Sequence, residues 1–178
     1  LPAYDPRGAQ GHGLQYATSN RGGCHVRGYM IFSEILGYPE KLETQMLEGK
    51  PMRVKMLQDL TAIIDALGFC LFTFFAFGRA EDYNDLLNAA TGFDMTTEEM
   101  MQAGERIWNL ERKFNLDAGI SPEEDTLPPR FFNEPLPDGP QKGAVAKMKE
   151  LLPEYYRLRG WDEKGHVPDS KLRDLAII

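Results

Sequence analysis

The chain has 178 residues, of which 42% are hydrophobic and 26% are charged, as expected for one globular domain with a single core. Its net charge is −7 and it has no basic stripe, so nucleic acid and anionic membranes are poor candidate partners. Its two cysteines exclude a disulfide framework and a complete metal-ligand set, and they suit a reducing, cytoplasmic compartment. The chain begins with Leu-Pro-Ala-Tyr rather than Met, so we expect it to be one piece of a longer polypeptide.

The first part of the chain predicts a loop, a short helix and a glycine-rich segment. Residues Leu1 to Gly13 contain several Pro and Gly breaks and indicate a loop, and Leu14 to Ser19 predict a short helix. Asn20 to Gly28 follows, with three glycines after Asn20-Arg21. Glycines let the backbone approach a ligand while charged side chains are held nearby. The alternative is an exposed turn whose arginines are solvated, and composition alone does not separate the two.

A short apolar segment, Tyr29 to Leu36, comes next. The break Gly37-Tyr38-Pro39 and a charged connection through Gly49 follow it. Met52 to Leu67 then has apolar residues at three- and four-residue steps and a proline suited to the first turn, which predicts a helix. Gly68 comes directly after it, as a left-handed cap does.

The most unusual stretch is the apolar run from Ile63 to Phe77, which carries one carboxylate, Asp65, and one thiol, Cys70. The run is too short and too interrupted for a membrane span of about 20 residues, so we expect it to form a protein interior or to line a site. An ionised Asp among apolar neighbours needs a donor or a cation to replace water. The alternative, which residue types alone favour, is a buried core cysteine and an Asp that caps a neighbouring helix.

The remaining sequence predicts helices joined by long loops. The region from Pro122 to Pro140 is rich in proline and irregular, and its Arg130-Phe131-Phe132 is a plausible contact point. Pro153 should kink or divide the helix that contains it. No strand-period alternation is present, so the fold class we expect is an all-α domain with long ordered loops. The further helices are predicted at Ala80 to Thr91, from a Thr96-Glu99 capping box through Phe114, at Ala144 to Leu158 and at Pro168 to Leu175.

The hexapeptide from Asp65 to Cys70 resembles the D-x-x-G-L-C motif of the aldehyde ferredoxin oxidoreductases, which are tungsten- or molybdenum-pterin enzymes. The resemblance covers essentially the whole chain. It implies that residues 1–178 are a single C-terminal helical domain, with the pterin-binding β domain and the middle helical domain absent. Four other segments resemble the family in its order: Asp5-Pro6-Arg7-Gly8, Tyr16 through His25, Leu127-Pro128-Pro129-Arg130, and Tyr155-Tyr156 through Gly160-Trp161-Asp162.

The resemblance also implies roles for the residues of this motif. Asp65 would accept hydrogen bonds from the N–H groups of one pterin. Cys70 would be the fourth thiolate ligand of a 4Fe-4S cluster. Phe69, which stands where the motif has Leu, and Leu71 would contact the pterin through their backbones.

The glycine-rich segment gains roles by the same resemblance. Arg21 and Arg27 would pair with the phosphate or the polar edge of the pterin, although the family often has Lys at the position of Arg27. His25 would donate or accept a proton near the metal. The implied reaction is the oxidation of an aldehyde to a carboxylate, with ferredoxin as electron acceptor. The implied partners are the upstream domains of the same polypeptide, ferredoxin, the aldehyde and, as an open option, a second copy of the chain.

Two alternatives stay open on the sequence. The chain could belong to a related class II benzoyl-CoA reductase or carboxylate reductase, or it could be a helical structural or interaction module without redox activity. The other three cluster cysteines and a second D-x-x-G motif are absent from these residues. We therefore expect the 178 residues alone to bind neither metal nor cluster in stoichiometric amounts, to be inactive, and to leave the surface around Asp65, Cys70 and His25 exposed or rearranged.

Overall fold

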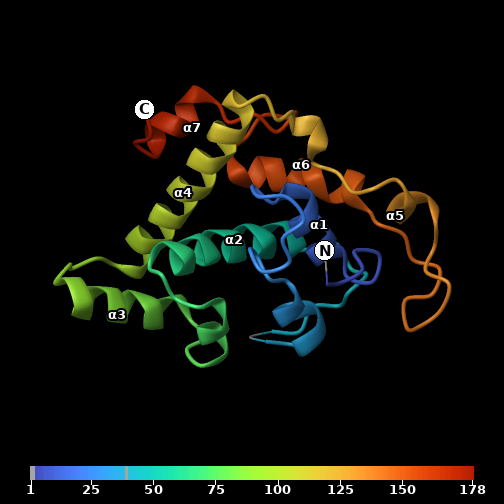
Figure 1. Cartoon of the computed structure of the whole chain (residues 1–178), viewed down its shortest axis with the longest axis horizontal. Coiled ribbons are helices and arrows are strands. Elements are labelled where there is room, and N and C mark those ends of the chain that lie inside the picture. The colour runs from blue at the N-terminus through green and yellow to red at the C-terminus, as the bar shows by residue number, and fades with distance from the viewer. Residues whose placement is uncertain (1–2, 39) are drawn as a thin grey trace.

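A computed structural model describes residues 3–38 and 40–178 (Figure 1). These residues form helices and no strands, which confirms the all-α expectation. None of their helices is long and apolar enough to cross a membrane. The α-helices are α1 (Gln10–Thr18), α2 (Lys50–Ala66), α3 (Ala80–Thr91), α4 (Thr97–Asp117), α5 (Arg130–Asn133), α6 (Met148–Arg159) and α7 (Asp169–Asp174), and shorter helical turns lie at Phe32–Leu36, Leu71–Phe75 and Pro122–Glu124.

Helix α2 is the centre of the molecule, and α1, α4 and α6 pack around it (Figure 1). Its apolar side, which includes Val54, Leu57 and Ile64, is buried, as the three- and four-residue spacing predicts. The first turn of α4 has the expected capping box: the Thr96 hydroxyl accepts from the Glu99 N–H at 3.2 Å, and the Glu99 carboxylate accepts from the Thr96 N–H at 2.8 Å. The packing of α2 against α4 brings these two helices side by side.

A buried ion pair fixes α6 to α2, and the sequence analysis did not predict it. The Arg159 guanidinium, which is fully buried, donates to Asp59, and it also donates to the Gln58 side-chain oxygen at 2.8 Å. The Tyr155 hydroxyl donates to the same Gln58 oxygen at 2.7 Å. A buried guanidinium requires partners of this kind, because its desolvation would otherwise cost several kcal/mol.

The expected loop through Gly13 is wrong in its last four residues, because α1 begins at Gln10. The Glu34 carboxylate accepts hydrogen bonds from the backbone N–H groups of Gly11 and His12 at 2.9 and 2.8 Å. It therefore satisfies donors that a helix start leaves without partners, and the buried Lys50 ammonium balances its charge. This capping carboxylate lies 23 residues downstream of Gly11, so local sequence does not reveal it. The first two residues of the predicted loop lie outside the described ranges.

Two further expectations change in detail. Helix α6 begins at Met148 rather than Ala144 and runs through Pro153 without division. The Pro153 ring removes one backbone donor, and the helix continues because the Leu151 and Tyr155 side chains on its inner side are buried in the core. At the predicted break after Leu36, Gly37 is left-handed with φ 73°, and Pro39 lies outside the described residues. The predicted helices at α3 and α7 are confirmed.

The close approach of α2 and α4 depends on Gly104, which generates a stability prediction. A Cβ atom at this position would lie 2.3 Å from the backbone oxygen of Asp59. Overpacking costs about 1–3 kcal/mol, and Ala gains about 1 kcal/mol over Gly in a helix. Because the clash is with backbone, we expect Gly104→Ala to lower the free energy of unfolding by about 2 kcal/mol, measured by urea denaturation.

Gly8→Ala is the matched control for this measurement, because its Cβ would meet its nearest neighbour at 3.4 Å, an ordinary contact distance. Equal denaturation midpoints for Gly104→Ala and the unchanged chain would contradict the packing described here.

Candidate functional site

The turn that follows α2 presents Asp65 and Cys70 on the molecular surface. Asp65 lies in the last helical turn, and Gly68 adopts the predicted left-handed conformation with φ 75°. The Gly68 N–H donates to the Asp65 carbonyl oxygen and the Phe69 N–H donates to the Ile64 carbonyl oxygen, both at 3.1 Å. The chain reverses here, so Cys70 is exposed and the alternative of a buried core cysteine is wrong.

Of the two expectations for the apolar run, a protein interior or the lining of a site, the first is wrong for the part after this turn. Phe72 and Phe75 are 67% and 58% exposed, whereas Phe74 is buried. The segment is a 3₁₀-helix, in which residues three apart share a side, so Phe72 and Phe75 both face outward. Phe69 and Leu71 are half-buried. The turn and its exposed aromatic residues therefore form one surface.

The glycine-rich loop, residues 20–28, is attached to both α1 and α4. The Gln15 side chain in α1 donates to the carbonyl oxygens of Cys24 and Arg27 at 2.7 and 2.5 Å. The Asn20 side chain donates to the carbonyl oxygen of Trp108 in α4 at 3.0 Å, and the Asn115 side chain donates to the Asn20 carbonyl oxygen at 2.7 Å. The loop is thus held in place, and the alternative of a turn with solvated arginines is wrong for the buried Arg27.

Asp65 meets both arginines of this loop. Its Oδ2 atom lies 3.2 Å from Arg21 Nη1 and 3.6 Å from Arg27 Nε. Arg21 is exposed, whereas the Arg27 side chain is 6% exposed, pairs with Glu111 of α4 at 2.8 Å and lies over the Trp108 ring at 5.3 Å. Cationic partners for Asp65 are therefore present, but the expected burial of this carboxylate is wrong, because its side chain is 41% exposed. Glu111 was missed, because nothing in its local sequence distinguishes it from other charged residues on an exposed helix face.

His25 lies in a different part of the same loop, among aromatic rings. Its ring centroid is 5.9 Å from that of Tyr4 and 6.5 Å from that of Tyr29. Behind it, the His12 ring is fully buried against the Tyr16 ring, with their centroids 4.5 Å apart. Burial, with a smaller contribution from the nearby His25, lowers the pKa of His12 to about 3, so His12 is neutral. His25 is the imidazole of the pair that is partly open to solvent.

Cys24, to which the sequence analysis gave no role, lies beside Arg21. Its Sγ atom accepts from Arg21 Nε at 3.4 Å. Burial raises the pKa of the Cys24 thiol, but hydrogen bonds from the Val26 backbone and from the Arg21 guanidinium lower it by more, so the net shift is downward. Its position between Arg21 and His25 was the available signal.

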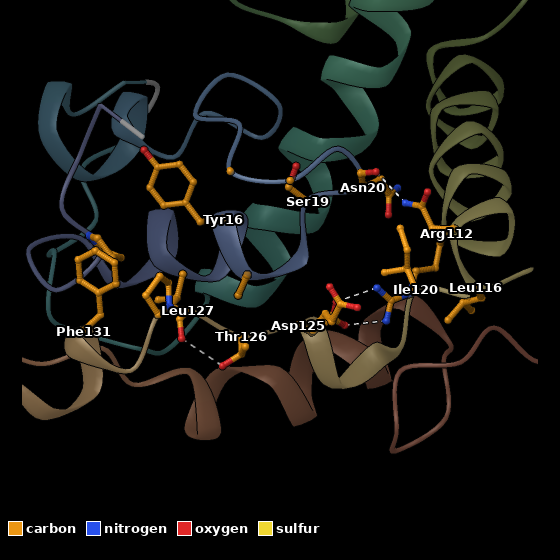
Figure 2. Close-up of a pocket in the computed structure, with 17 residues that line it drawn as sticks. Tyr16, Ser19, Asn20, Arg112, Leu116, Ile120, Asp125, Thr126, Leu127 and Phe131 are labelled. Atoms are coloured by element: carbon orange, nitrogen blue, oxygen red, sulfur yellow. Dashed lines mark hydrogen bonds and ion pairs between the residues drawn. The ribbon is translucent and has the colours of Figure 1, made fainter. Parts of the chain in front are cut away.

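A cavity of about 400 Å³ is lined in part by the start of the glycine-rich loop and does not include Asp65, Cys70 or His25. Figure 2 shows Leu127 and Phe131 at one end of it and Asn20 and Arg112 at the other. Phe131 belongs to the predicted contact point at 130–132 and is one of its lining residues. Arg112 is paired with Asp125 through two contacts of 2.7 Å, so its charge is neutralised. The lining offers no set of metal ligands.

The groups around Asp65 and Cys70 suit part of a cofactor site. In the described ranges, no three His, Cys, Asp or Glu side chains lie close enough to hold a metal ion. Cys70 supplies one exposed thiol, which fits one corner of an iron–sulfur cluster whose other ligands come from elsewhere. Asp65 supplies hydrogen-bond acceptors at a half-exposed position, which fits the N–H groups of a heterocycle.

Comparisons with known proteins show which proteins the chain is similar to. The family model for aldehyde ferredoxin oxidoreductase, domains 2 and 3, matches residues 1–177. The chain is 58% identical to the tungsten-containing aldehyde ferredoxin oxidoreductase of Pyrococcus horikoshii and 59% identical to that of Pyrococcus furiosus, in each case over 99% of this chain and 29% of the relative. It is also 35% identical, over 51% of its length and 16% of the relative, to an aliphatic sulfonate oxidoreductase, WOR-like subunit, of Pyrococcus furiosus. The chain thus spans about 29% of the length of these aldehyde ferredoxin oxidoreductases.

The contact between Arg21 and Cys24 predicts a measurable change in thiol reactivity. Because the guanidinium stabilises the thiolate, Arg21→Gln should raise the pH at which Cys24 becomes half-alkylated. The measurement is the rate of iodoacetamide labelling against pH, with the Cys24 peptide followed by mass spectrometry. Arg157→Gln is the matched control, because Arg157 is an exposed arginine of α6. An unchanged profile in the Arg21 variant would show that this contact does not act on the thiol.

Proposed function

The chain belongs to the aldehyde ferredoxin oxidoreductase family, and from that premise we propose that it is the C-terminal helical domain of a tungsten-pterin enzyme that oxidises aldehydes to carboxylates. The family match over residues 1–177 and the identity of 58% over 99% of the chain support this assignment. The upstream part of the polypeptide would supply the pterin-binding β domain, the middle helical domain and the other cluster ligands. Ferredoxin would accept the electrons.

The observation that carries the proposal is the turn from Asp65 to Cys70. It presents a carboxylate and an exposed thiol on one short segment, and two guanidiniums stand beside the carboxylate. A thiolate is the ligand that an iron–sulfur cluster requires, and a carboxylate accepts hydrogen bonds from pterin N–H groups. One segment would therefore contact both the pterin and a 4Fe-4S cluster, which gives electrons a short route between them.

We assign each predicted residue a role on this basis. Asp65 binds the pterin N–H groups, and the exposed Arg21 can turn outward to the phosphate. Arg27 is buried, so it contributes its positive charge beside Asp65 from inside the protein. The Phe69 N–H already donates to Ile64, so its backbone contact with the pterin would use its carbonyl oxygen, and Leu71 contributes its backbone.

The reaction adds the oxygen of water to an aldehyde and yields a carboxylate, three protons and two electrons. The tungsten-pterin group, when bound, supplies the oxygen transfer and accepts the electrons. In this chain, His25 takes up and releases protons, because its imidazole is partly open to solvent and an imidazole nitrogen can accept or donate a proton.

A second candidate function differs only in the substrate. The relative named as an aliphatic sulfonate oxidoreductase subunit indicates that this domain type also occurs with other substrates. Aldehyde oxidation is preferred here because identity to the aldehyde enzymes is higher and covers nearly the whole chain. The class II benzoyl-CoA reductases and the carboxylate reductases are further alternatives that differ in their substrate. Molybdenum is the alternative to tungsten as the metal. A helical module without redox activity would not require Cys70.

The upstream domains are the partner we propose for the exposed aromatic surface beside Cys70. Phe72, Phe75 and Phe77 lie there, directly after the proposed cluster ligand. A patch of large apolar side chains is typical of an interface. The chain matches only 29% of the relative's length, and the remaining part is long enough to bury this patch.

The assignment of Cys70 predicts a specific loss of iron. In the longer polypeptide, Cys70→Ser should lower the iron content per chain and the visible absorption of the cluster, because serine oxygen is a poor replacement for a thiolate ligand. Cys24→Ser is the matched control and should keep its iron. Equal iron contents in the two variants would reject Cys70 as the cluster ligand.

The 178 residues alone should bind neither tungsten nor iron in stoichiometric amounts and should not oxidise aldehydes. One thiolate and one pterin-binding carboxylate form only part of each site. Elemental analysis, visible absorption and an assay with a dye acceptor measure this on the isolated chain. A full cluster spectrum from this chain would contradict the proposal that the site is completed by upstream domains.

A further inference from the structure

Arg27 occupies an unusual position between two carboxylates. Its side chain is 6% exposed, and its Nη1 donates to Glu111 at 2.8 Å. Its Nε is buried and has no hydrogen-bond partner in the described parts of the chain. The Asp65 Oδ2 atom lies 3.6 Å from that Nε, which is beyond hydrogen-bond distance. Arg27 is therefore bonded to Glu111 and only close to Asp65.

The scaffold around Arg27 keeps this asymmetry in place. The guanidinium lies over the Trp108 ring at 5.3 Å, and Trp108 is fully buried. Glu111 is one turn further along α4, and Asn20 donates both to the Trp108 carbonyl oxygen at 3.0 Å and to Glu111 at 3.4 Å. Helix α4 thus holds Arg27 through the Trp108 ring and the Glu111 carboxylate, and the Arg27 Nε stays 3.6 Å from Asp65, beyond hydrogen-bond distance.

Removal of the Glu111 charge would change which carboxylate compensates the positive charge of Arg27. A buried guanidinium must be compensated by a nearby negative charge, and Asp65 is the other carboxylate that faces Arg27. Arg27 would then close the gap from its Nε to Asp65 and occupy an oxygen of that carboxylate. Arg21 differs, because it is exposed and can move away when another group needs Asp65.

We propose that Glu111 is a positioning residue for the pterin site: it binds Arg27 and thereby keeps Arg27 from forming a direct hydrogen bond to Asp65, so that the cofactor has to displace only the exposed Arg21. This inference rests on the proposed function. It assigns a role to a residue outside the D-x-x-G motif and outside the glycine-rich loop, one that acts through Arg27 and does not touch the cofactor.

The test is cofactor retention in the longer polypeptide, measured as tungsten and pterin per chain after repeated desalting. The variant Glu111→Gln keeps the shape and a hydrogen-bond acceptor but removes the charge. We expect about fivefold weaker retention, the upper end for a half-exposed ion pair. Asp117→Asn is the matched control, because Asp117 is an exposed carboxylate of the same helix that pairs with Lys113. It should retain the cofactor fully.

A double-variant cycle separates this role from a merely structural one. If Glu111 acts through Asp65, Glu111→Gln should cause little further loss when Asp65 is already Asn. Equal retention in Glu111→Gln and the unchanged enzyme, or losses that add in the double variant, would overturn the inference. Should the Gln variant fail to fold, Glu111→Met, which removes the charge and keeps a side chain of similar length, takes its place in the same cycle with the same criterion.

The proposed function and this inference fail in different ways. An unchanged enzyme that holds no tungsten or pterin overturns the proposed function, and the role of Glu111 with it. An unchanged enzyme that holds both, together with a Glu111→Gln variant that holds them equally well, overturns only the role of Glu111.

Discussion

The charge contact between Asp65 and the two arginines of the glycine-rich loop is the interaction on which the site depends. It joins the last turn of α2 to a loop that begins more than forty residues earlier in the chain. Because Arg27 is buried and bonded to Glu111, the contact also includes α4. Three segments distant in sequence are thereby fixed around one half-exposed carboxylate. A ligand that binds Asp65 has to replace Arg21, the exposed member, and leaves the buried one in place.

The scaffold beneath this contact explains how a loop rich in glycine keeps a defined position. Helices α2 and α4 approach closely at Gly104, and the buried Arg159–Asp59 pair fixes α6 to α2. Glycine lowers the cost of close approach but also lowers local stability, so the loop depends on side chains from its neighbours, including Gln15 and Asn115. The packed helices stabilise the fold, and the loop and the turn carry the residues of the candidate site.

Local features of the sequence predicted the helices and the turn well. Spacing of apolar residues gave α2, Gly68 marked its end, and the lone carboxylate in an apolar run pointed to Asp65 and its need for a cation. Features that depend on distant residues were not predictable. The start of α1 relies on Glu34, the burial of Arg159 relies on Asp59, and the position of Glu111 beside Arg27 is set by helix packing. The exposure of Phe72 and Phe75 was missed because an apolar run has the same sequence pattern whether it is buried by its own domain or by another one.

The central claim is that a single turn contacts both a pterin and an iron–sulfur cluster. Anomalous diffraction from crystals of the longer polypeptide, recorded at the tungsten and iron absorption edges, tests it most directly. The account predicts iron density within bonding distance of the Cys70 sulfur, and a pterin whose N–H groups face the Asp65 carboxylate on the side of the tungsten. Iron bound without a contact to Cys70, or a pterin that leaves Asp65 still paired with Arg21, would contradict it.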